Sequence, residues 1–294
     1  MAGQGHIAEG LMDSFVFTAV LFAAACHAGW NAAIKTGLDP LASTALITTG
    51  AGIVSLALIP FVGLPPAAAW PWVVASVVIH LFYFIGLSEA YQAGELGQVY
   101  PLARGSAPLM TAGATTLLLG EKLNGLGWTG IVTLAVGVLL LSLRGGRTGA
   151  DQHLDRRAVF FALFTAVTIC LYSVVDGIGG RTSGNPHSYT LAMFVGNSAI
   201  MLVYFLARRG FTALAPLPKL WPIGLFGGSL QLLSYGIVIW AMTKAPIAPV
   251  TALRETSVLF GAVLAFFLLK EPLKPARIAA ALMIVCGLVL IRLS

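Results

Sequence analysis

Long apolar runs follow one another along nearly the whole chain, separated by short stretches that hold most of the charges and prolines. A helix that crosses a bilayer needs about 20 mainly apolar residues, whereas the strands of a membrane barrel give alternating segments of about ten. Continuous runs of this length therefore predict transmembrane helices. Cutting the chain at charges, prolines and glycine clusters gives ten spans, at 14–34, 42–62, 70–91, 98–119, 125–143, 158–178, 188–207, 221–243, 249–269 and 276–293.

The composition narrows the class of protein further. Of the 294 residues, 58% are hydrophobic and 10% are charged, and the mean hydropathy is +0.90. A soluble domain carries about 25% charged residues, so there are too few charges here to cover a surface that faces water. The same richness in apolar residues excludes a disordered chain. We therefore expect an all-α integral membrane protein that contacts lipid.

The basic residues indicate topology rather than a nucleic-acid partner. The net charge is +6, but the Lys and Arg residues lie between apolar runs instead of gathering on one soluble face. Loops that follow odd-numbered spans hold 11 of them and the opposite side holds 4, which predicts both termini outside the cytoplasm. The three cysteines lie far apart within apolar runs and have no metal-ligand spacing, so no metal and no cofactor are expected.

The chain repeats itself at a spacing of 150 residues. Residues 104–143 align without a gap with residues 254–293, which pairs Arg104 with Arg254, Glu121 with Glu271 and Gly137 with Gly287. The chain is then a duplicated unit of five spans. Because five is odd, the second copy inserts upside down, and inverted repeats are typical of secondary transporters, which bind substrate near mid-membrane between the repeats.

This repeat divides the chain into four parts. They are an N-terminal tail at 1–13, a first repeat at 14–143 with spans one to five, a linker at 144–157 and a second repeat at 158–294 with spans six to ten.

Three segments carry a resemblance to a known family. They are HAGWNAAIK at 27–35, LLLGEKLNGLGWTGIVTLAVGVLLL at 117–141 and its second-half copy LLKEPLKPARIAAALMIVCGLVLI at 268–291. The chain resembles a ten-helix member of the drug/metabolite transporter superfamily built from two EamA-type repeats, over residues 14–294. Within that superfamily it is similar to the YddG-type exporters of aromatic and other neutral amino acids.

The resemblance implies a multi-pass transporter of the inner (plasma) membrane that exports such amino acids by alternating access. A permease or exporter for another small metabolite or a drug is the alternative, and the oligomeric state stays open. Small four-span relatives carry a Glu in their first span that exchanges protons for drug, and neither first-span copy here has one. Proton coupling through Glu255 or Asp176 and facilitated diffusion are both left open.

Charged residues within spans are candidates for function, because burying a charge in lipid is costly unless it faces a partner or a cavity. Arg104 lies in the fourth span, Arg254 and Glu255 occupy the matching place in the ninth, and Asp176 ends the sixth. A structural ion pair and substrate contact are equally open for the first three. Four prolines flank these charges and predict hinges or helix breaks that line a cavity: Pro101, Pro108, Pro246 and Pro249.

Polar and aromatic residues at helical spacing extend the candidate pathway. In the third span Ser76, His80, Phe84 and Tyr91 share one face, and in the eighth Gln231 and Tyr235 follow two glycines, for which we favour close helix packing. Such a stripe suits a substrate with an apolar ring and a zwitterionic head. The full set of candidates is His80, Phe84, Tyr91, Tyr100, Arg104, Gln231, Tyr235, Arg254, Glu255, Trp30 and Asn31.

Other classes of membrane protein fit less well. An intramembrane aspartyl protease needs two Asp residues within spans, a zinc protease needs HExxH, and an ATP-driven pump needs a Walker A motif, and the sequence has none of these. A channel usually builds its selectivity ring by oligomerisation, whereas this chain carries its own internal symmetry. The sequence therefore predicts a transporter and not an enzyme.

Overall fold

The computed structural model describes residues 12–33, 39–93, 96–143, 156–215, 217–269 and 275–294. Within these ranges the regular structure is helical. The helices are α1 (Ser14–Ala33), α2 (Pro40–Val62), α3 (Trp70–Ala93), α4 (Leu96–Leu119), α5 (Gly125–Leu143), α6 (Arg156–Thr182), α7 (Pro186–Arg209), α8 (Trp221–Met242), α9 (Ile247–Arg254), α10 (Ser257–Leu269) and α11 (Pro275–Arg292), with short 3₁₀ helices η1 (Ala67–Ala69), η2 (Phe211–Leu214) and η3 (Leu217–Leu220).

The helices confirm the all-α membrane fold and follow the ten predicted spans. Six of the described helical segments are long and apolar enough to cross a bilayer, and they belong to α1, α2, α3, α6, α7 and α8. The apolar parts of α5 and α11 are shorter, at Gly125–Leu141 and Ile278–Arg292. The ninth span is the exception, because the structure divides it into α9 and α10.

The break between α9 and α10 is made by tight backbone turns. The amides of Glu255 and Thr256 donate to carbonyls three residues back, those of Ala252 and Leu253, at 3.0 and 3.1 Å. The Thr256 hydroxyl also donates to the Leu253 carbonyl, at 2.7 Å. These bonds replace the α-helical ladder locally, and they place Glu255 at a helix break instead of inside a continuous helix.

The four prolines expected to break helices do not mark this break. Helix α4 runs through Pro101 and Pro108, Pro246 is the residue before α9, and Pro249 lies in the first turn of α9. The first turn of a helix tolerates proline because its amides lack partners there in any case. Pro246 and Pro249 therefore mark where α9 begins and not where it ends, and Pro101 and Pro108 do not interrupt α4.

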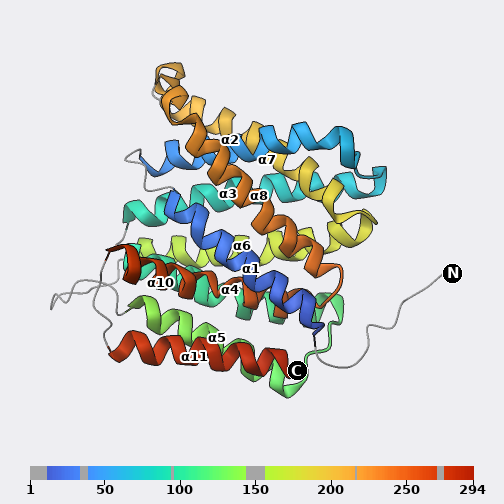
Figure 1. Ribbon diagram of the computed structural model, residues 1–294, viewed down its shortest axis with the longest axis vertical. Coiled ribbons are helices and arrows are strands. Elements are labelled where there is room, and N and C mark those ends of the chain that lie inside the picture. The colour runs from blue at the N-terminus through green and yellow to red at the C-terminus, as the bar shows by residue number, and fades with distance from the viewer. Residues whose placement is uncertain (1–11, 34–38, 94–95, 144–155, 216, 270–274) are drawn as a thin grey trace.

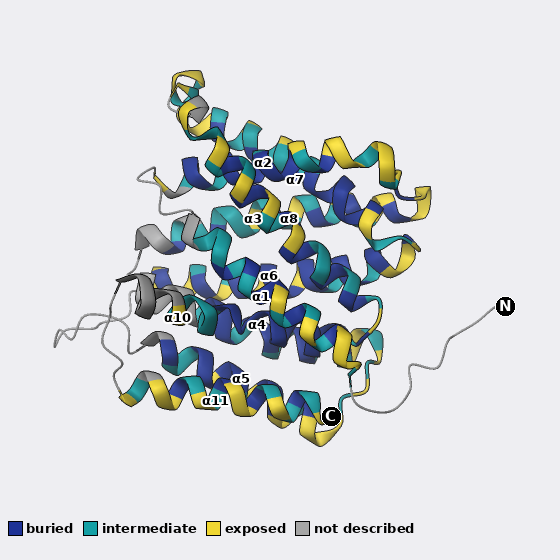
Figure 2. Cartoon of the chain, viewed as in Figure 1, coloured by how far each residue is buried: buried dark blue, intermediate teal, exposed yellow. Residues whose placement is uncertain are grey.

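The two halves of the chain pack in matching pairs. In Figure 1, α5 and α11 lie side by side at one end of the molecule and α2 and α7 at the other. Between them α1 packs on α8, and its counterpart α6 packs on α3. Figure 2 shows the outer face of α11 as largely exposed, as expected for a surface that meets lipid.

Repeat-related glycines bring α5 and α11 into close contact. A Cβ added at Gly137 would lie 2.8 Å from the Ile284 side chain, and one added at Gly287 would lie 2.7 Å from the Leu134 amide nitrogen. Leu134 and Ile284 are themselves 150 residues apart, so each helix makes the same contact on the other. Such reciprocity is what a pseudo-twofold axis between inverted repeats requires.

The close packing favoured for the glycines of the eighth span is confirmed. A Cβ at Gly224 would lie 2.8 Å from the Leu46 side chain, and one at Gly228 would lie 2.3 Å from the Ala51 amide nitrogen. Helices α2 and α8 therefore approach each other backbone to backbone. These glycines support the fold and do not line the candidate pathway.

Candidate functional site

Two arginines from different repeats meet at one carboxylate in the middle of the helix bundle. Arg104 on α4 and Arg254 at the end of α9 each lie 3.2 Å from the Oε1 atom of Glu255. The exposed fractions of the three residues are 3%, 2% and 0%. Buried charges in a membrane protein must be paired or hydrogen-bonded, and Glu255 pairs with both arginines. The helix break between α9 and α10 positions Glu255 for this network.

The segment HAGWNAAIK joins the network through its histidine. The Nε2 atom of His27 on α1 lies 2.5 Å from an Arg104 guanidinium nitrogen. Trp30 donates its indole N–H to His27 Nδ1 at 3.3 Å, and Asn31 donates its side-chain amide to the His27 carbonyl at 2.8 Å. Of the predicted candidates, Trp30 therefore contacts the His27 ring and Asn31 the His27 backbone, and His27 itself contacts the charged centre.

An aromatic cluster covers the other side of Arg254. The Arg254 guanidinium lies 5.5 Å from the ring centroid of Tyr172 and 5.6 Å from that of Tyr235. Tyr172 also accepts a hydrogen bond from Arg254 at 3.1 Å, and His80 stacks on Tyr172 with ring centroids 4.4 Å apart. Tyr83 completes the cluster with its edge against Tyr172. The arrangement offers aromatic faces directly beside a cation.

Asp176 connects three helices next to this cluster. Its side chain is fully buried and accepts hydrogen bonds from the Tyr235 hydroxyl at 2.5 Å and the Tyr189 hydroxyl at 2.8 Å. The Tyr189 hydroxyl also lies 3.2 Å from the Trp72 carbonyl. We call the three residues Asp176, Tyr189 and Tyr235, from α6, α7 and α8, the aspartate tie.

Two buried polar atoms at the charged centre have no hydrogen-bond partner in the described part of the chain. They are Nε of Arg254 and Oε2 of Glu255, and they belong to neighbouring residues of opposite charge. A buried donor or acceptor without a partner costs about 1–3 kcal/mol, and more when the group is charged. Each unpaired atom is therefore a place where a ligand atom of opposite charge would be stabilised.

The remaining predicted residues lie at different distances from this centre. Phe84 packs against an apolar cluster of α2 and α7 that includes Met201 and Phe205, and its ring also contacts Tyr83 of the aromatic cluster, with centroids 5.3 Å apart. Gln231 is half-buried on α8, and its Oε1 atom has no partner among the described residues. The side chains of Tyr91, Tyr100 and Pro101 fall outside the described residues.

Sequence reasoning did not single out Tyr172, Tyr189 or Tyr83. One signal was present, because Tyr172 and Asp176 are four residues apart and so share a helix face. No such spacing links Tyr189 to Asp176, because they lie on different helices.

Glu121, which the internal repeat pairs with Glu271, has a structural explanation. Both carboxylate oxygens of Glu121 accept a hydrogen bond from the backbone amide of Ile247, at 3.0 and 2.9 Å, and Glu121 pairs with Arg181 at 2.9 Å. Arg181 in turn donates to the carbonyls of Met242 and Ala245, at 2.8 and 3.1 Å. This Glu121–Arg181 clamp caps the first turn of α9. Pro246, the residue before the helix, makes no side-chain cap hydrogen bond there.

A group of three metal-ligating side chains is absent from the part of the chain that the structure describes. The polar centre is built instead from arginine, carboxylate, imidazole and phenol groups. These suit the binding of a charged organic molecule.

The family assignment rests on both halves of the chain. A model of the EamA-like transporter family matches residues 13–143 and, again, residues 156–293. The chain belongs to the EamA-like transporter family. An EamA-like transporter with this run of apolar helices is a multi-pass protein of the inner membrane. It transports a small molecule, and its outer surface contacts lipid.

Curated relatives match a smaller part of this EamA-like transporter. The spermidine export protein MdtI of Citrobacter koseri is 33% identical over 70 residues, and that of Salmonella arizonae is 34% identical over the same length. Each match covers 24% of this chain and 64% of the relative, so this chain spans just under two thirds of the length of these relatives.

A solved structure shares the architecture of the whole chain. It is described as "Crystal structure of protein", has 17% sequence identity and a TM-score of 0.73, and is covered over 98% of its length by 94% of this chain. At this identity the likeness concerns the fold alone.

Proposed function

We propose that this EamA-like transporter exports neutral amino acids, aromatic ones among them, and binds them as zwitterions at the charged centre. The observation that carries the proposal is the unpaired couple of Arg254 Nε and Glu255 Oε2. An amino acid supplies a carboxylate and an ammonium group on one carbon. It would satisfy both atoms at once with charge-assisted hydrogen bonds.

The aromatic cluster supports the choice of side chain. Tyr172 and Tyr235 lie under the Arg254 guanidinium, and His80 stacks on Tyr172. A substrate whose carboxylate pairs with Arg254 would therefore place its side chain against aromatic faces. Aromatic rings prefer such offset or edge contacts, and an aliphatic side chain also loses contact with water there.

The burial of the centre supports transport by alternating access. Arg104 comes from the first repeat and Glu255 from the second, and neither is exposed by more than 3%. A substrate reaches Glu255 only when the repeats move apart on one side. The Arg104–Glu255 ion pair is the contact that such movement and substrate binding would rearrange.

Export of a polyamine is the second candidate, because the curated relatives are named for spermidine export. A polyamine carries several positive charges and no carboxylate, so its site needs an excess of carboxylates. Here Arg104 and Arg254 balance Glu255 and Asp176, which favours a zwitterion over a polycation.

The test is flux through liposomes that contain the purified protein. The substrates are labelled phenylalanine, phenethylamine, which lacks the carboxylate, phenylpropionate, which lacks the ammonium group, and spermidine. We expect flux of phenylalanine to exceed that of each analogue by about tenfold or more, because losing one charge-assisted hydrogen bond costs about 1.5–3 kcal/mol.

Two variants test whether the flux depends on the unpaired Nε atom of Arg254. Arg254→Lys keeps the positive charge but removes Nε, and we expect phenylalanine flux to fall about tenfold. Arg157→Lys is the control, because Arg157 lies at the exposed start of α6. Spermidine flux above that of phenylalanine would favour the second candidate, and flux of neither would reject both.

A further inference from the structure

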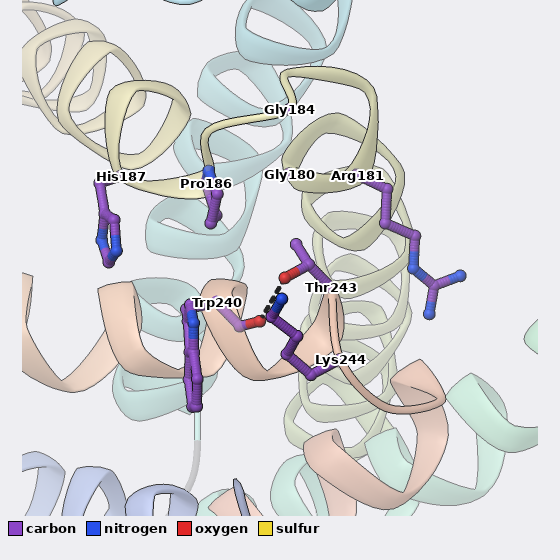
Figure 3. A pocket seen from close by; sticks show the side chains of 8 residues that line it. All are labelled: Gly180, Arg181, Gly184, Pro186, His187, Trp240, Thr243 and Lys244. Atoms are coloured by element: carbon purple, nitrogen blue, oxygen red, sulfur yellow. Dashed lines mark hydrogen bonds between the residues drawn. The ribbon is translucent and has the colours of Figure 1, made fainter. Parts of the chain in front are cut away.

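A pocket of about 380 Å³ opens between the ends of three helices on the face where α6 ends and α7 begins. Its walls are the C-terminal turn of α6, the first residues of α7 and the end of α8 (Figure 3). This volume lies within the range of small-molecule sites, about 300–1,000 Å³. The pocket is separate from the buried charged centre described above.

The chemistry of the pocket favours an anionic group beside an apolar one. Arg181, His187 and Lys244 line it, and no acidic residue does. His187 and Lys244 are exposed, and no ion pair to either is found in the described residues. Arg181 is already engaged by Glu121, and in Figure 3 its side chain extends away from the indole ring of Trp240. Lys244 and His187 are thus the groups free to meet a carboxylate, and Trp240 provides an aromatic surface.

The pocket lies about one helical turn from the aspartate tie, along the same three helices. On α6, Gly180 of the pocket is four residues from Asp176; on α7, His187 is two residues from Tyr189; on α8, Trp240 is five from Tyr235. One helical turn rises about 5.4 Å, so the same three helices that wall the pocket are joined about one turn below it. Tyr235, in turn, lies under Arg254 of the charged centre.

We infer that this pocket is a second substrate site, in which Lys244 holds the amino acid carboxylate, Trp240 contacts its side chain and the aspartate tie separates it from the charged centre. This inference rests on the proposed function. A substrate that has passed the tie meets a weaker, water-accessible site of the same chemistry before it is released.

The test is protection of a cysteine in the pocket wall from a water-soluble maleimide. Thr243→Cys places a thiol in the wall and leaves Lys244 and His187 in place, and the wild type corrects for the native cysteines, of which Cys26 and Cys170 are buried and Cys286 is exposed. We expect phenylalanine to slow labelling of the variant in a saturable way. We expect Lys244→Gln in the same chain to raise the half-protecting concentration about tenfold.

Two further chains separate a second site from indirect effects. Lys122→Gln removes an exposed cation that does not line the pocket, and protection should stay unchanged. Arg254→Lys, which we expect to impair flux, should retain protection. Loss of protection in Arg254→Lys would mean that labelling reports occupancy of the charged centre, and it would overturn the second site.

Lipid is the competing occupant, and the same assay covers it. Protection by nanodiscs of anionic phosphatidylglycerol, with none by phenylalanine in nanodiscs of neutral phosphatidylcholine, would assign the pocket to a headgroup phosphate and overturn the inference. Phenylalanine flux with no protection at Thr243→Cys would also overturn it, yet would leave the proposed function standing. Absence of amino acid flux would reject the proposed function itself, and the second site with it.

Discussion

Arg104 and Arg254, which are 150 residues apart, both donate to the same oxygen of Glu255, each at 3.2 Å. The repeat duplicates the arginine but not the carboxylate, because the counterpart of Glu255 in the first half is Gly105. One carboxylate therefore serves two cations. This asymmetry within a symmetric framework leaves room for a second carboxylate, which a substrate could bring.

The first prediction concerns that shared carboxylate. Glu255→Gln leaves two buried arginines facing a neutral amide, and breaking a buried pair in this way costs about 3–5 kcal/mol. We expect a marked fall in the thermal unfolding midpoint of the detergent-purified protein. Glu89→Gln is the control, because its ion pair with Arg157 lies at the surface, where such pairs contribute about 1 kcal/mol or less. Equal midpoints for the two variants would contradict a structural role for Glu255.

The sequence was sufficient to predict the spans, the repeat and the positions of the buried charges, because a long apolar run predicts a transmembrane helix and a charge within it must be paired or face a cavity. The break after Arg254 escaped prediction because Thr256 and backbone turns create it, whereas the pattern drew attention to prolines. On α3 the predicted face includes His80, which stacks on Tyr172, but it does not include Tyr83, whose ring also contacts Tyr172. Neighbouring residues on a helix point about 100° apart, and packing across the repeats turns Tyr83 inward and Phe84 toward α7.

The second prediction concerns the contact between α5 and α11. Gly287→Ala would place a Cβ 2.7 Å from the Leu134 amide nitrogen and 2.8 Å from the Gly130 carbonyl oxygen, so the helices must separate. Overpacking of this kind costs about 1–3 kcal/mol. Gly113→Ala is the matched control, because a Cβ there meets nothing within 4 Å, and alanine stabilises a helix relative to glycine by up to about 1 kcal/mol. Thermal unfolding should therefore shift in opposite directions for the two variants.

The third prediction concerns the aspartate tie. Asp176→Ala leaves the buried Tyr235 hydroxyl without its acceptor, at a cost of about 1–3 kcal/mol, whereas the Tyr189 hydroxyl keeps the Trp72 carbonyl. Asp176→Asn keeps one carbonyl oxygen as an acceptor and should lose less. The unfolding midpoints should follow the order wild type, Asn, Ala. If alanine proved as stable as the wild type, the tie would not hold the three helices together.

The fourth prediction concerns the Glu121–Arg181 clamp, which joins the start of α9 to the end of α6. Glu121→Ala removes the acceptor of the Ile247 amide and the partner of Arg181 together, so this face should open more often. We expect maleimide labelling at Thr243→Cys, one residue from the Met242 carbonyl that Arg181 binds, to become severalfold faster. Lys122→Ala, next in the chain and exposed, should leave the rate unchanged.

The repeat places Glu271 at the matching position of the second half, so Glu271→Ala should leave labelling on this face as it is in the wild type. Faster labelling in both glutamate variants would show general loosening of the fold, whereas faster labelling in Glu121→Ala alone would identify the clamp as the closure of this face.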